Sequence, residues 1–300
     1  MFQQMLFLFI FIMIGLFLGK TGRIDPAHSG IISGLMVYVC TPFLNFRTFA
    51  RNFTRTYIQE NYIYIIAAVI VIFVLHFCGG WFSRRLTKAS YEQKVWQYSM
   101  VTPNFGYMGI PVVIGTLGEE ALMDFMMFSL PFNLYIYAYA LPVLTRSKAS
   151  VRNFLTLPML SIFAGMAVGL AEITLPDPVT ELISPAADAM GCFGMILLGL
   201  VIAQFSVRDM LENRNLYIIT ALRLVGIPLL IGIPAMLLLP PEMGLIILIF
   251  CALPCGMNTV VFPKLAGENC LPGAGIALVS STAACLTLPV LTAIFTSLFF

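Results

Sequence analysis

The chain has 300 residues, of which 60% are hydrophobic and 10% are charged, and its formal net charge is +2. An average soluble domain is about 45–50% apolar and about 25% charged, so a water-soluble globule of this length would leave much apolar surface in water. The composition excludes soluble enzymes, nucleic-acid-binding proteins and disordered scaffolds. The mean hydropathy of +0.95 and the long apolar runs predict a polytopic membrane protein.

Ten apolar segments are long enough to cross a membrane as helices, which need about 20 residues each. They are residues 2–19, 29–49, 61–82, 95–116, 122–144, 154–172, 184–204, 215–239, 243–263 and 273–299. They are too long for barrel strands and do not alternate strictly, so we predict an all-α fold. The chain has no Cys-x-x-Cys pair and only 2 histidines, so we expect no metal site.

The lysines and arginines predict the orientation. With the N-terminus outside, 12 of the 16 basic residues fall in cytoplasmic connections, 3 fall in external ones, and Arg223 lies within a span. The 12 are Lys20, Arg23, Arg84, Arg85, Lys88, Lys94, Arg146, Lys148, Arg152, Arg208, Arg214 and Lys264. Because basic residues are retained on the cytoplasmic side, we predict a multi-pass protein of the cell inner membrane with both termini extracytoplasmic.

Short motifs recur at about half the chain length. Residues 12–19 (IMIGLFLG) match residues 162–169 (IFAGMAVG) at three positions, and the sequence LPVLT occurs at residues 141–145 and again at residues 288–292. Each half then holds five spans, and because five is odd the halves must have opposite orientations. We therefore predict two inverted five-helix repeats, residues 1–146 and 153–300, an architecture common among secondary transporters.

The fourth and ninth predicted spans are interrupted at matching places. Residues 102–111 read TPNFGYMGIP, and residues 253–259 read LPCGMNT. Proline and glycine at this density cannot continue a regular helix, and paired breaks in the two halves indicate the binding site of a transporter. Half-helix N-termini carry partial positive charge, which suits an anion; the alternative is a pair of purely structural kinks.

These motifs resemble those of the auxin efflux carrier family. The residues that carry the resemblance are the run from Pro103 to Pro111, the run from Pro254 to Val261, the opening sequence GLFLG and the eighth-span sequence RLVGIP. The resemblance implies ten spans in two inverted repeats, with broken helices four and nine crossing at mid-membrane beside the substrate. It implies a scaffold of spans one, two, six and seven and a mobile unit formed by the others. The short connection between the halves favours a permease of the bacterial type.

Individual residues near the breaks are candidates for substrate contact. Asn104 and Asn258 offer amide groups, and the resemblance places both at the substrate. The other candidates for binding are Gly106, Gly109, Gly256, Thr259, Arg223, Asn45 and Asn133, while Pro103, Pro111 and Pro254 open the helices. For Asn45 the alternative is a side chain that is simply solvated, and for Asn133 it is a hydrogen bond that packs helices together. An arginine within a span is a functional hypothesis by default, but Arg223 could instead snorkel or tie helices together.

The sequence therefore predicts a secondary transporter of small organic anions, mono- or dicarboxylates, that works by alternating access. Two alternatives stay open: a sodium-coupled symporter, and a receptor with a transporter fold that binds without transport. No catalytic motif of an intramembrane enzyme is present. We expect no cofactor, with Na⁺ or H⁺ coupling left open. The expected partners are a small organic anion and the lipid bilayer, no nucleic acid, and a homodimer is left open.

Overall fold

A computed structural model describes residues 2–118, 120–148, 155–204 and 213–299. All regular elements in these ranges are helices, and the only β pairing in them is one isolated bridge, which confirms the predicted all-α class. Most of the predicted connection between the two halves, and both Arg152 and Arg208, lie outside the described residues.

The helix bounds follow the apolar runs, although the third predicted span begins at Arg55 rather than at residue 61, and the seventh begins at Asp177 rather than at residue 184. The helices are α1 (Phe2–Lys20), α2 (Ser29–Leu35), α3 (Thr41–Asn52), α4 (Arg55–Leu86), α5 (Ser90–Val101), α6 (Ile110–Leu117), α7 (Glu120–Tyr135), α8 (Leu141–Leu144), α9 (Leu157–Leu170), α10 (Asp177–Ala203), α12 (Arg214–Ala221), α13 (Ile233–Leu238), α14 (Pro241–Ala252), α15 (Asn258–Leu265) and α16 (Leu271–Phe299). Several of them join into longer helices through short connecting turns.

Six of these helical stretches are long and apolar enough to cross a membrane. They are Pro26–Asn52, Arg55–Leu86, Glu120–Leu144, Asp177–Ala203, Arg214–Leu238 and Leu271–Ile294. Four shorter apolar helices accompany them: Phe9–Lys20, Phe105–Leu117, Leu157–Leu170 and Pro241–Ala252. The protein is therefore a helical bundle with several membrane-spanning helices.

Widened π-helical turns occur at five places in the described ranges, and each ends two residues before a proline. The turns are Met36–Cys40, Phe105–Gly109, Ile136–Ala140, Leu222–Gly226 and Pro228–Gly232, followed by Pro42, Pro111, Pro142, Pro228 and Pro234. In each case the residue before the proline donates its N–H to the carbonyl five residues back. A proline ring clashes with the carbonyl four residues back, and the wider turn moves that carbonyl aside, so the helix continues.

Two glycine positions allow close helix packing in the two halves. A Cβ atom on Gly15 of α1 would lie 2.2 Å from the carbonyl oxygen of Ile196 in α10, and one on Gly165 of α9 would lie 2.9 Å from that of Phe46 in α3. Gly15 and Gly165 are the equivalent glycines of the repeated motif at residues 12–19 and 162–169. The two copies of the motif thus allow the same kind of close helix contact, between α1 and α10 and between α9 and α3.

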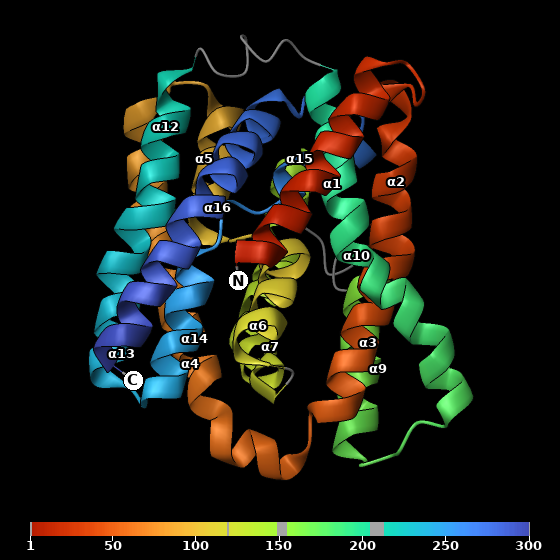
Figure 1. Ribbon diagram of the computed structural model, residues 1–300, viewed down its shortest axis with the longest axis vertical. Helices are drawn as coiled ribbons and strands as arrows, with labels where there is room; N and C mark the ends of the chain where they lie inside the picture. Colours follow the sequence, from red (N-terminus) through yellow and green to blue (C-terminus); the bar gives the residue numbers. More distant parts are fainter. Residues whose placement is uncertain (1, 119, 149–154, 205–212, 300) are drawn as a thin grey trace.

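The helices run mainly along the long axis of the molecule, with α6 and α7 in its middle (Figure 1). The end of α1 and the start of α12 lie at one end of the bundle, and the α3–α4 connection lies at the opposite end (Figure 1). Lys20 ends α1 and Arg214 begins α12, whereas Arg51 and Arg55 flank the α3–α4 connection. Residues predicted on opposite sides of the membrane therefore lie at opposite ends of the bundle.

Candidate functional site

The two predicted helix breaks meet in the structure and pair with each other. Pro103 and Cys255 form an antiparallel bridge, in which the Asn104 N–H donates to the Pro254 carbonyl at 2.8 Å and the Gly256 N–H donates to the Thr102 carbonyl at 3.0 Å. Backbone groups freed by the breaks thus satisfy each other, which is needed where no water is available. We call this pair of segments, residues 102–104 and 254–256, the crossover.

Both breaks begin at the residue before a proline. Helix α5 ends before Thr102, with ψ of 112°, and α14 ends before Leu253, with ψ of 149°. A proline disfavours helical geometry for the residue that precedes it and drives that residue into extended backbone. Pro103 and Pro254 therefore stop their helices and leave extended segments that can pair.

Gly256 lets the two segments approach each other. A Cβ atom at this position would lie 2.9 Å from the Thr102 carbonyl oxygen and 3.3 Å from that of Pro103. Both neighbours are backbone atoms and cannot move without separating the segments. Gly256, a candidate for substrate contact in the sequence, is therefore in close contact with the crossing backbone.

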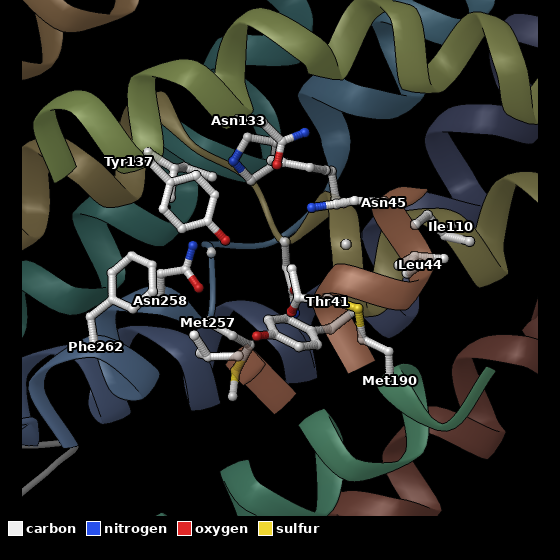
Figure 2. Close-up of a pocket in the computed structure, with 18 of the residues that line it drawn as sticks. Thr41, Leu44, Asn45, Ile110, Asn133, Tyr137, Met190, Met257, Asn258 and Phe262 are labelled. Carbon is white, nitrogen blue, oxygen red and sulfur yellow. The ribbon is translucent and has the colours of Figure 1, made fainter. Parts of the chain in front are cut away.

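A small polar pocket lies beside the crossover and gathers seven of the predicted residues. Its volume is about 50 Å³. The predicted residues that line it are Asn45, Pro103, Asn104, Gly106, Asn133, Gly256 and Asn258. Side chains from both halves surround the cavity, including Asn45 of α3, Asn133 of α7 and Asn258 of α15 (Figure 2). Pockets for drug-sized ligands measure about 300–1,000 Å³, so this one has room for only a few atoms.

Asn104 stands out among the polar residues of the pocket. Its side chain is 2% exposed, and within the described part of the chain neither its Oδ1 nor its Nδ2 atom has a hydrogen-bond partner. No other residue in the described ranges has two such atoms. Buried polar groups are nearly always paired, and an unpaired one costs about 1–3 kcal/mol. Both polar atoms of this side chain therefore have hydrogen-bonding capacity that the described protein atoms do not use.

The other three pocket asparagines already donate within the protein. The Nδ2 of Asn45 donates to the Pro158 carbonyl at 3.2 Å, and that of Asn133 donates to the Ser129 carbonyl at 3.3 Å. The Nδ2 of Asn258 donates to the Tyr98 hydroxyl at 3.0 Å. Asn45 is buried, so its alternative of simple solvation does not hold, and its bond links α3 to α9. The Asn133 bond lies within its own helix, α7, so it does not show the alternative of packing between helices. Both side chains also line the pocket.

Five predicted residues lie away from the pocket lining. Gly109 faces Leu253 and Phe125, and a Cβ atom there would lie 2.7 Å from each. The Thr259 hydroxyl is buried and donates to the Gly256 carbonyl at 3.0 Å. The Pro254 carbonyl is bonded to Asn104 in the crossover. Arg223 lies in the widened turn Leu222–Gly226, and Pro111 occupies the first turn of α6.

Arg223 binds the backbone at both helix breaks. Its side chain is 1% exposed. Its Nη1 donates to the Met100 carbonyl at 2.9 Å, its Nε to the Leu253 carbonyl at 3.0 Å and its Nη2 to the Phe250 carbonyl at 3.2 Å. These carbonyls belong to the C-terminal ends of α5 and α14. Arg223 therefore ties helices together, which is one of the alternatives that the sequence left open.

The bonds of Arg223 explain how a cation is stable in the middle of the bundle. A helix C-terminus carries the equivalent of about −0.5 charge, so the ends of α5 and α14 together offset about one positive charge. None of the ion pairs found among the described residues includes Arg223. The backbone therefore takes the place of a carboxylate.

Sequence reasoning missed several residues that line the pocket. Tyr98 and Tyr137 contribute aromatic walls, and Met190 of α10 closes one side. Tyr98 lies one turn before the break at Thr102, and Tyr137 lies in the widened turn before Pro142. Both are near a proline that distorts a helix, and this is the sequence feature from which they could have been identified as pocket residues.

The architecture and the site define a multi-pass helical membrane protein with a polar pocket at paired helix breaks. The sequence profile of the membrane transport protein family, which includes the auxin efflux carriers, matches residues 1–152 and 141–292, and the chain belongs to this family. A protein named as an uncharacterized transporter in Methanocaldococcus jannaschii is 26% identical over 122 residues, which are 39% of this chain and 38% of that protein. This match covers well under half of either chain.

Proposed function

We propose that the protein is a secondary transporter of small organic anions that carry a carboxylate, and that the anion binds in the crossover pocket. The observation that carries the proposal is Asn104, a buried amide with both polar atoms unpaired. A carboxylate oxygen would accept a hydrogen bond from its Nδ2 atom. Membership of a membrane transport protein family supports transport rather than catalysis.

The surroundings of the pocket favour a negative ligand. Helix α15 begins at Asn258, and the helical turn that leads into α6 begins at Phe105, and both residues line the pocket. Helix N-termini attract anions, and no acidic side chain lines the cavity. No lysine or arginine lines it either, so the pocket supports one carboxylate held by dipoles and amides better than two closely spaced charges.

We further propose that the chain forms ten spans in two inverted repeats, residues 1–146 and 153–300, with both termini extracytoplasmic. The four shorter apolar helices would complete the ten. The repeated motif supports the symmetry, because its first copy packs span one on span seven and its second copy packs span six on span two, and both contacts join the two halves. These four spans would be the scaffold, and the spans around the crossover would move against them.

The pocket volume of about 50 Å³ also fits alternating access. Such a cavity holds a few water-sized groups, since about 10–15 Å³ suffices for one. A substrate with several carbon atoms would need the walls to separate. Met190, on the proposed scaffold helix α10, lines the cavity together with Asn104 and Asn258 of the proposed mobile unit. Relative motion of the two units would therefore change the size of the pocket.

The test is counterflow of labelled carboxylates in liposomes that contain the purified protein. We expect Asn104→Ala to weaken the apparent affinity about 10- to 150-fold, which corresponds to a lost charge-assisted hydrogen bond of about 1.5–3 kcal/mol. Asn215→Ala is the matched control, because Asn215 donates to the Leu86 carbonyl far from the pocket. Esters of the substrate should compete poorly, since they lack the charge that the helix N-termini attract.

Three outcomes of this assay would contradict the proposal or part of it. Normal counterflow by Asn104→Ala would place the site elsewhere. Equal competition by acid and ester would remove the argument for an anion. Saturable binding of the anion without counterflow would identify a receptor. The same liposomes with and without Na⁺ or a pH gradient would determine the coupling ion.

A further inference from the structure

A second cavity, larger than the crossover pocket, lies between α4 and α5. Its volume is about 190 Å³, and it shares no lining residue with the crossover pocket. Helix α4 contributes His76, Phe77 and Arg84, and α5 contributes Lys94 and Gln97. We call it the α4–α5 cavity. The cavity is therefore separate from the proposed transport site.

The lining of the α4–α5 cavity is strongly cationic. Arg84 and Lys94 line it, and none of its lining residues is acidic. The nearby carboxylate of Glu92 accepts a hydrogen bond from the Thr87 hydroxyl at 2.9 Å, and neither residue lines the cavity. Such a cavity attracts an oxyanion, because two basic side chains face it without a compensating acid.

The inner wall of the cavity is a fixed polar surface. Gln97 is 6% exposed. Its Nε2 donates to the His76 carbonyl at 3.0 Å, and its Oε1 accepts from the Tyr139 hydroxyl at 3.2 Å. The Lys94 ammonium donates to the same Tyr139 hydroxyl at 3.5 Å. These bonds hold one of the cations at the cavity even without a ligand.

The outer face of α4 beside the cavity is apolar and aromatic. Phe77 lines the cavity while being 59% exposed, Phe73 one turn earlier is 64% exposed, and their rings lie 4.6 Å apart. Trp81 is also exposed, with the Arg85 guanidinium 4.3 Å above its ring. Exposed tryptophan marks the headgroup level of a bilayer. The cavity therefore opens at headgroup depth beside a surface suited to acyl chains.

We propose that the α4–α5 cavity binds the phosphate of an anionic phospholipid. Arg84 and Lys94 would contact the phosphate, and the acyl chains would lie along Phe73 and Phe77. Basic pockets between membrane helices recognise lipid headgroups in this way. A free phosphate ion offers the same kind of oxygen atoms but would make no contact with the aromatic surface, so the lipid is the better fit.

The test compares lipid binding by two double variants of the delipidated protein. Arg84→Gln/Lys94→Gln removes both cations of the cavity. Arg85→Gln/Lys88→Gln removes the same charge at the same end of α4, from two residues that do not line the cavity. Native mass spectrometry and thermal shift would measure binding of phosphatidylglycerol, with zwitterionic phosphatidylcholine as the reference lipid.

We expect the cavity variant to bind phosphatidylglycerol about 30-fold more weakly, which corresponds to about 2 kcal/mol for two basic contacts. The control variant should bind it as the wild type does. Equal weakening in both variants would overturn the proposal, because it would reflect general surface charge. Equal affinity of the wild type for phosphatidylglycerol and phosphatidylcholine would overturn it too.

A third variant separates a lipid from free phosphate. Phe77→Ala should weaken phosphatidylglycerol binding but leave any stabilisation by inorganic phosphate unchanged. If inorganic phosphate stabilises the wild type as strongly as the lipid does, and Phe77→Ala changes neither, the lipid is ruled out as the occupant. Phe77 is exposed, so its replacement should not impair folding.

Discussion

Replacing Arg223 tests whether one side chain holds both helix breaks. Arg223→Met keeps much of the apolar stem but removes the guanidinium, which leaves the carbonyls of Met100, Phe250 and Leu253 without their donor. An unsatisfied buried acceptor costs about 1–3 kcal/mol, so three of them should destabilise the protein by about 3 kcal/mol or more. The ends of α5 and α14 would also face each other with uncompensated negative dipoles.

Arg223→Lys should have an intermediate effect. The ammonium keeps the charge but is a single point, whereas the guanidinium presents donors along a planar fork. One or two of the three carbonyls should keep a donor, and we expect a loss of about 1–3 kcal/mol. The order of stability should therefore be wild type, then Arg223→Lys, then Arg223→Met.

The Tm of thermal unfolding in detergent measures the stability of the wild type and of the two Arg223 variants. Soluble domains of 150–250 residues lose about 2–4 °C of Tm per kcal/mol, so Arg223→Met should melt at least about 6 °C below the wild type. Arg214→Met is the matched control, because Arg214 begins the same helix and is exposed, and its Tm should stay close to that of the wild type. An unchanged Tm for Arg223→Met, with transport intact, would refute the reasoning.

Two further predictions concern the crossover and the orientation. Gly256→Ala should lower stability by about 1–3 kcal/mol by overpacking and should abolish most transport, because its Cβ atom would lie 2.9 Å from the Thr102 carbonyl oxygen. Gly34→Ala, with no atom within 4 Å of the added Cβ, should be neutral in the same melting and uptake assays; equal behaviour of the two variants would contradict the close approach. In a cysteine-free background, cysteines introduced at Ser90 and Ser147 should react only from the cytoplasmic side, and one at Asp177 only from outside. Reaction of the Ser147 position with an impermeant reagent on intact cells would exclude the proposed inverted repeats.

The helices and their breaks could be predicted because their causes are local. Apolar runs determine where helices can cross a bilayer, and the residue before a proline leaves helical geometry whatever surrounds it. Thr102 and Leu253 follow this rule. Their pairing was expected from the family resemblance, and the structure confirms that the two breaks meet.

The partners of Arg223 could not be predicted from the sequence. They are backbone carbonyls of Met100, Phe250 and Leu253, separated from it by between 27 and 123 positions. A carbonyl carries no mark of residue type, so no side-chain pattern points to it. The same limit applies to Tyr98 and Tyr137, since helices that are buried on all sides show no periodicity that separates pocket walls from core.

The positions of Arg223 and Asn104 suggest how the proposed site can bind an anion and still release it. Arg223 binds the C-terminal ends of α5 and α14 inside the bundle, so its charge is offset by two helix ends and its side chain does not line the pocket. The pocket is left with neutral amides and the partial charges of helix N-termini. A full cation there would hold a carboxylate tightly and slow its release. In the proposed transporter the charge of Arg223 therefore fixes the two broken helices, and the described residues that line the pocket offer the substrate partial charges.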